Sequence, residues 1–243
     1  MPSFISSYPV ADLLFTAYLL IYFPLDALRR SRFKAAPKPP MSALRSYARQ
    51  GRYILTLLAL FMLVNLLEHH TASELGLALP PATAGLWGLA VALGLLISLH
   101  FLGTWMESRM TAAERGKQQQ KLRALAFPMP QNRIEMAAYC ITMVGMTSTW
   151  EILFRGYLLL VLTPLIGMPW AVALAALAYG AGHGFESVKQ CAGSIAAAFA
   201  FTLGYAVTGS LWWLIMLHAA APLALPFAAR KLHDAVPVER VSA

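Results

Sequence analysis

Residues 149–156, Thr-Trp-Glu-Ile-Leu-Phe-Arg-Gly, place a carboxylate and a guanidinium four residues apart inside a long apolar run, Met136 to Ile166. A charged side chain at the centre of a bilayer costs roughly 2.5 to 3.5 kcal/mol on insertion scales. Glu151 and Arg155 are i and i+4, so on a helix they lie one turn apart on one face and can pair. The stretch therefore predicts a self-neutralising ion pair in a membrane-spanning helix.

The composition of the whole chain supports this membrane setting. Hydrophobic residues make up 58% of the 243 residues and charged residues 12%, and the mean hydropathy is +0.59. These values lie outside the range of ordinary soluble domains. We therefore expect an all-α fold, a polytopic transmembrane helical bundle of about seven spans.

About 20 helical residues cross the ~30 Å hydrocarbon core of a bilayer, which gives a length for each expected span. The run from Met136 to Ile166 is too long for one perpendicular span, so tilt or a break near Gly145 must absorb the excess. The seven expected spans are Pro9 to Leu28, Tyr53 to Leu67, Gly85 to Trp105, Met136 to Ile166, Trp170 to Gly184, Cys191 to Val207 and Ser210 to Ala229.

Basic residues outnumber acidic residues, nineteen to eleven, and fall almost wholly between the apolar runs. This distribution favours orientation by the positive-inside rule over nucleic-acid binding. Seven spans with an outside N-terminus place all the basic regions, and the C-terminus, in the cytoplasm. We expect membrane lipid as a partner and no nucleic acid, with part of the basic linker 29–52 lying on anionic lipid.

The expected organisation has three parts: N-terminal transmembrane helices with two basic cytoplasmic loops in residues 1–134, a core in residues 135–230, and a cytoplasmic tail in residues 231–243. The two cysteines, Cys140 and Cys191, lie in apolar segments and indicate neither a disulfide framework nor a cysteine metal cluster. Asp12 is expected near a span end within reach of interfacial water. His69 and His70, without a nearby third ligand, are expected in a solvated loop.

Few ionisable side chains remain at membrane depth in the second half of the chain: Glu151, Arg155, His183 and His218. Each has a structural interpretation, as an ion pair or as a histidine that hydrogen bonds between helices. Taken together, a carboxylate and two imidazoles on three segments converge only if three helices pack around them. Such a cluster suits a zinc-type ion and hydrolysis, with a carboxylate able to act as general base toward water.

These residues resemble the motifs of the CPBP family of intramembrane metalloproteases, which includes the CAAX prenyl endopeptidases and Abi-like bacterial relatives linked to bacteriocin processing and immunity. The family's motifs are Glu-Glu-x-x-x-Arg, often ending Phe-Arg-Gly, then Phe-x-x-x-His, then His-x-x-x-Asn. Here Glu151 to Gly156 match the end of the first motif, Tyr179 to His183 the second, and His218 to Pro222 the third. The resemblance spans Met136 to Ala229, about two-fifths of the chain.

Three positions depart from the family pattern. Trp150 stands where the resemblance places the catalytic base, Tyr179 replaces Phe, and Pro222 replaces an Asn that would help to bind the oxyanion or the substrate carbonyl. If Glu151 joins the two histidines as a metal ligand, no separate base remains. If Glu151 is the base, only two ligands remain. Two routes could restore activity: Glu151 takes the role of the base, or Glu186, three residues beyond His183, reaches the site.

The resemblance implies an intramembrane metallo-endopeptidase with Glu151, Arg155, His183 and His218 as catalytic residues and with His183, His218 and Glu151 as ligands of a divalent metal, zinc by donor type. Its substrate would be a protein or peptide at a membrane, which for this family is expected to be a bacterial inner membrane. Because of Trp150 and Pro222, the sequence leaves open whether the chain is an active enzyme. The alternative is a non-catalytic relative that serves as a membrane-embedded binding, immunity or maturation factor.

Overall fold

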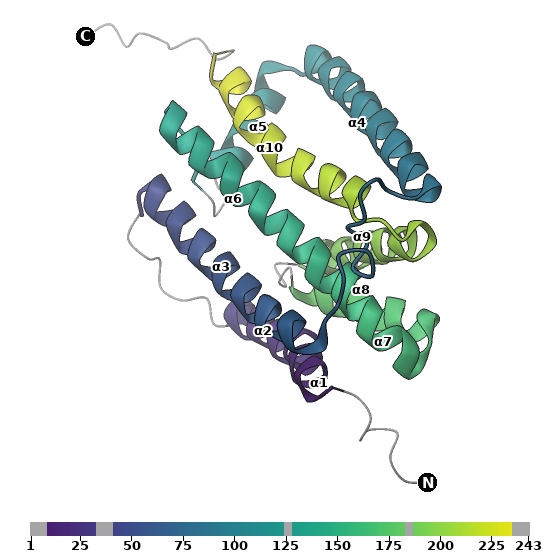
Figure 1. Ribbon diagram of the computed structural model, residues 1–243. Coiled ribbons are helices and arrows are strands. Elements are labelled where there is room, and N and C mark those ends of the chain that lie inside the picture. Colours follow the sequence, from purple (N-terminus) through teal and green to yellow (C-terminus); the bar gives the residue numbers. More distant parts are fainter. Residues whose placement is uncertain (1–8, 33–40, 124–127, 183–186, 235–243) are drawn as a thin grey trace, which may run out of the picture.

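The computed structural model describes residues 9–32, 41–123, 128–182 and 187–234, and all regular elements in these ranges are helical (Figure 1). This confirms the predicted all-α bundle. In chain order the elements are α1 Val10–Ala17, η2 Tyr18–Tyr22, α2 Phe23–Arg32, α3 Ala43–Glu68, α4 Thr83–Arg109, α5 Ala112–Arg123, α6 Arg133–Glu151, η3 Ile152–Tyr157, α7 Leu158–Ile166, α8 Met168–Gly182, α9 Val188–Thr208 and α10 Trp212–Asp234, with η2 and η3 being π-helical.

Within the described ranges, six helical segments are long and apolar enough to cross a membrane, namely 10–30, 43–68, 83–109, 133–166, 188–208 and 212–230. The protein is therefore an integral membrane protein. The fifth expected span, Trp170 to Gly184, forms the shorter apolar helix α8 of 15 residues, and its predicted end, Gly184, lies outside the described residues. Helix α3 begins ten residues before the predicted span, because the basic linker preceding Tyr53 is rich in Ala, Leu, Arg and Gln, which favour helix.

The long apolar run forms one continuous helical segment, Arg133 to Ile166, with no break at Gly145. Its irregularity lies seven residues later, where η3 widens the helix at the charged motif. This segment is the most buried of the six, at 61% against 11% for α4. Figure 1 shows α6 running between α3 and α10, so the motif lies on the central helix of the bundle.

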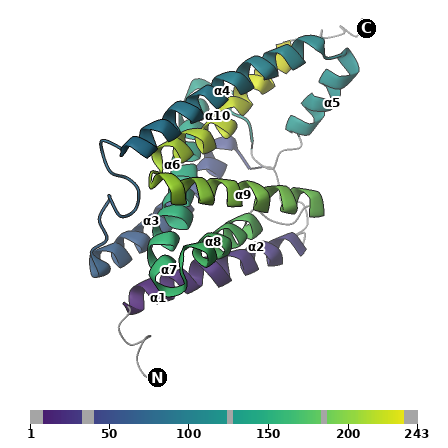
Figure 2. The same ribbon diagram turned by 90° about the vertical axis from the view of Figure 1, so that its right-hand side faces the viewer.

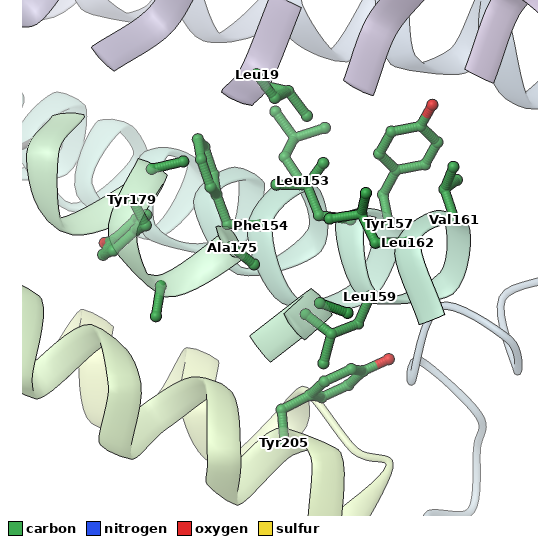
Figure 3. Close-up of a cluster of buried hydrophobic side chains, with 14 of the residues drawn as sticks. Leu19, Leu153, Phe154, Tyr157, Leu159, Val161, Leu162, Ala175, Tyr179 and Tyr205 are labelled. Carbon is green, nitrogen blue, oxygen red and sulfur yellow. The ribbon is translucent and has the colours of Figure 1, made fainter. Parts of the chain in front are cut away.

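The main core forms where η3 and α7 pack against α1, η2 and α8. Leu153, Phe154, Tyr157 and Leu158 are all completely buried in it. Figure 3 shows Leu153 next to Leu19 of η2 and Phe154 on the side of Tyr179 of α8. The same packing holds the charged motif in the interior.

Helix α9 is rich in small residues and packs along α8, as Figure 2 shows. The close approach uses Gly180 of α8, because a Cβ atom there would lie 2.7 Å from the Cα atom of Ile195. Only 22% of the residues in the most apolar stretch of α9 are nevertheless buried. Small residues therefore permit one close helix contact here and do not place α9 at the centre of the bundle.

Two expectations for the N-terminal half were wrong. Asp12 is buried, at 4% exposure, and both of its carboxylate oxygens lie 3.0 Å from Nε2 of His70. The hydroxyl of Tyr157 donates a further hydrogen bond to Oδ1 of Asp12 at 3.0 Å. The loop after α3 thus returns over η3, and His70 forms part of a buried polar cluster, while His69 is exposed and ends α3 in a left-handed conformation.

Candidate active site

Glu151 and Arg155 form the predicted ion pair on the central helix. Nη1 of Arg155 donates to Oε1 of Glu151 at 3.3 Å, and both side chains are fully buried. Glu151 is the last residue of α6 and Arg155 lies within η3, so the pair stands where the helix changes to π geometry. π-Helical turns are frequent at functional sites, and here one brings two charges into a closed interior.

His218 reaches the same carboxylate from α10. Its Nδ1 lies 2.6 Å from Oε1 of Glu151, and its side chain is 21% exposed. An ionised carboxylate only accepts hydrogen bonds, so Nδ1 carries the proton and donates it. The structure therefore brings together Glu151, Arg155 and His218, three of the four predicted catalytic residues.

Tyr179 of α8 completes this cluster. Its hydroxyl lies 3.2 Å from Nε2 of His218, and Cζ of Arg155 stands 3.8 Å above the centre of its ring. In the neutral imidazole Nε2 is an acceptor, so the tyrosine O–H donates to it. Sequence reasoning treated Tyr179 as a mild replacement of Phe and did not include it in the site. The signal was the added hydroxyl itself, at a motif position one turn before His183.

Within the part of the chain that the structure describes, several buried polar atoms of the site have no hydrogen-bond partner: Oε2 of Glu151, and Nε and Nη2 of Arg155. Unsatisfied buried polar atoms are costly and uncommon in native structures, and one accepted explanation is an unseen ion or ligand. Oε2 of Glu151 in particular is a buried acceptor with free lone pairs. It has the chemistry to bind a metal ion, a water molecule or a proton.

Carboxylate oxygen and imidazole nitrogen are the donor types that a zinc-type ion takes in catalytic sites. Among the described residues no group of three or more His, Cys, Asp or Glu side chains could hold a metal ion. The predicted third ligand, His183, and the possible rescuer, Glu186, lie outside the described residues. The donors present fit a divalent ion in type, with Oε2 of Glu151 free and Nε2 of His218 engaged by Tyr179.

Trp150 lies in an aromatic cluster on the neighbouring face of the helix. Its ring centre is 4.8 Å from that of Phe23, 5.8 Å from that of Phe154 and 6.3 Å from that of Tyr53. The side chain at the position of the family's first glutamate therefore packs against α2 and α3. Its role in this chain is to join these helices to the central helix.

Pro222 lies one turn after His218 on α10 and is half-buried. It has no side-chain donor, and it has no N–H to bond the carbonyl of the residue four positions earlier, which is His218. Its own carbonyl accepts a hydrogen bond of 2.7 Å from the hydroxyl of Tyr139 on α6. The proline thus fixes α10 against α6 and leaves the predicted oxyanion contact unfilled.

Gly156, the last residue of the motif, has a packing role. A Cβ atom there would lie 2.7 Å from the carbonyl oxygen of Leu75 in the loop between α3 and α4. The same loop bonds to α10, since the N–H of Leu211 donates to the carbonyl of Gly76 at 2.9 Å. Only a residue without a side chain lets this loop lie directly on η3.

Comparison with known proteins gives one family match. Residues 133–224 match the model of the Rce1-like family, described as type II CAAX prenyl endopeptidase. The searches of curated proteins and of solved structures gave no match. The matched segment begins at α6 and ends within α10, so it contains every residue of the cluster. It confirms the resemblance to the CPBP family over this segment of the chain.

Proposed function

We propose that the protein is an intramembrane metallo-endopeptidase that hydrolyses a peptide bond in a membrane-associated protein or peptide. The observation that carries the proposal is the Glu151–Arg155–His218 cluster, in which one buried carboxylate oxygen has no hydrogen-bond partner among the described residues. Ionisable groups at membrane depth mark functional sites, because a purely structural role rarely repays the cost of burying them. The family match adds the reaction class.

The proposed ligands of a divalent ion, zinc by donor type, are Glu151, His183 and His218. Such an ion polarises a carbonyl group and lowers the pKa of a water molecule. Arg155 donates a hydrogen bond to Oε1 of Glu151, and the same oxygen orients the imidazole of His218 through its contact with Nδ1, an arrangement common around metal-binding histidines.

Turnover is expected to be low. Trp150 packs among aromatic rings and supplies no separate general base, and the loss of such a base typically lowers a rate by about 10²- to 10⁴-fold. Pro222 adds no oxyanion donor. If Glu151 itself takes the proton of the attacking water, the histidines alone remain as ligands.

The test is cleavage of a quenched fluorescent peptide with a farnesylated C-terminal Cys-a-a-X sequence by the full chain in liposomes. We expect metal-dependent cleavage that His218→Ala and Glu151→Gln abolish. His100→Ala is the matched control, because His100 also lies in an apolar helix but is exposed and far along the chain from the motifs. Cleavage that persists in His218→Ala would refute the proposal.

A second candidate is a non-catalytic relative that binds a membrane partner as a binding, immunity or maturation factor. The packing of Trp150 against Phe23 and the presence of Pro222 favour it. It predicts a cellular phenotype that His218→Ala abolishes and that chelators leave unchanged. Cleavage that appears only in the double variant Trp150→Glu with Pro222→Asn would identify a degenerate site and support this candidate.

The proposed location is the bacterial inner membrane with a cytoplasmic C-terminus. In Figure 1 the starts of α3 and α6, the ends of α4 and α10, and the whole of α5 lie toward one end of the bundle. These segments carry basic residues, including Arg49, Lys117 and Arg230, and this distribution supports a cytoplasmic assignment of that end by the positive-inside rule. Reporter fusions after residue 243 and in the loop 69–82 should give opposite orientations.

A further inference from the structure

The hydroxyl of Tyr179 engages the one ring nitrogen of His218 that Glu151 leaves free. Glu151 lies 2.6 Å from Nδ1 and Tyr179 lies 3.2 Å from Nε2, so both nitrogens of His218 have a protein partner. A metal ion bound by His218 needs a lone pair on one of these nitrogens. Since the Nδ1 proton is held by a carboxylate, Nε2 is the nitrogen available for this purpose.

We propose that Tyr179 is a positioning residue that holds His218 in a resting state. Its hydroxyl donates to Nε2, keeps the proton of the imidazole on Nδ1, and must release Nε2 before that nitrogen binds a metal ion. The inference rests on the proposed metal-dependent function and adds to it a device specific to this chain. The family motif has Phe at this position, which cannot form the bond.

The contact is built into the interior rather than formed at the surface. Tyr179 is 5% exposed, its ring lies edge-on to Phe154 with centres 5.3 Å apart, and the guanidinium of Arg155 covers one face at 3.8 Å. These contacts fix the ring, so the hydroxyl stays near Nε2. His218 is the more exposed partner, at 21%, and is the side chain with room to move.

Binding of Co²⁺, a visible substitute for zinc, to the full chain in nanodiscs tests the inference without any activity assay. Tyr179→Phe removes the competing hydrogen bond, and the net contribution of one such bond corresponds to a change of about 2- to 12-fold in affinity. We expect Tyr179→Phe to bind Co²⁺ tighter by this factor and His218→Ala to lose binding. Tyr205→Phe, which removes another buried tyrosine hydroxyl on α9, is the control and should match the wild type.

Equal or weaker Co²⁺ binding by Tyr179→Phe would overturn the inference and leave the proposed function standing. No His218-dependent binding in any variant would overturn the inference together with the proposed metal site. A second readout needs no metal ion. The ¹⁵N spectrum of the protein with labelled histidine is recorded, and the signal of His218 is identified as the one that His218→Ala lacks. We expect an unprotonated Nε2 in the wild type, and a protonated Nε2 would also overturn the inference.

Discussion

Replacement of Arg155 by Met removes one member of a fully buried ion pair and leaves the other in place. The Nη1 to Oε1 distance of 3.3 Å corresponds to about 5 kcal/mol of attraction at an effective dielectric constant of about 20. Much of this attraction offsets the desolvation of both charges, so the pair adds little net stability. Its rupture is different, because Glu151 would then stay ionised in the interior or take up a proton. We expect Arg155→Met to lower the free energy of unfolding by about 3–5 kcal/mol.

The chain contains a matched control with the same i, i+4 spacing. Arg30 and Asp26 lie 2.7 Å apart, but their side chains are 64% and 35% exposed. Exposed pairs contribute about 0–1 kcal/mol, so Arg30→Met should be nearly neutral. The double variant Arg155→Met with Glu151→Gln removes both buried charges and should regain most of the lost stability.

The assay is reversible unfolding of the purified chain in mixed micelles of increasing SDS content, followed by far-ultraviolet circular dichroism. Arg155→Met and Arg30→Met are compared under identical lipid and salt conditions. Equal losses in the two variants would refute the reasoning, since they would show that burial does not set the cost. A double variant as unstable as Arg155→Met would show that the arginine acts through packing rather than charge.

Three further outcomes follow from the structure. Gly156→Ala should displace the loop that holds Leu75, with a loss of about 1–3 kcal/mol in the same unfolding assay from overpacking; an unchanged midpoint would contradict the close contact. Trp150→Glu, made alone, should lower stability by less than the roughly 3–5 kcal/mol that the loss of a fully buried tryptophan costs, because Trp150 is half-buried, and should give no gain in peptide cleavage; increased cleavage would show that position 150 reaches the site. The backbone N–H of Thr71 donates to Glu74 and lowers the pKa of that carboxyl below its ordinary value of 4.5. Because the pKa of Glu74 is lower in the folded state, its ionised form adds stability to the folded state at pH values above 4.5. The stability advantage of the wild type over Glu74→Gln should therefore shrink as the pH falls below 4.5. An advantage that grows toward acid pH would contradict this prediction.

The pairing of Glu151 with Arg155 was predictable because it depends on helix periodicity alone. Helical residues four apart share a face whatever surrounds them. In an apolar run the two charges pair because an unpaired charge there would be costly. The buried Asp12–His70 contact was not predictable in this way. It joins α1 to a loop 58 residues away, and each residue taken singly resembles a polar group at a span end.

Trp150 shows the same limit within the motif itself. The sequence indicates that a tryptophan replaces a glutamate, and from that alone a defective site follows. The structure adds that the ring packs against Phe23 of α2, 127 positions earlier in the chain (150 minus 23), so the residue also has a structural role. Only the packing of α2 against the central helix decides this.

The sequence by itself determined the membrane class, the all-helical fold and the order of the three motifs, because these follow from hydropathy, length and local spacing. The tertiary structure decided which groups meet at the site. The crossing of α6, α8 and α10 sets the two partners of His218, with Glu151 at Nδ1 and Tyr179 at Nε2. Such contacts depend on how helices distant in sequence pack, and side-chain packing in three dimensions has no signature in the periodicity of any one segment.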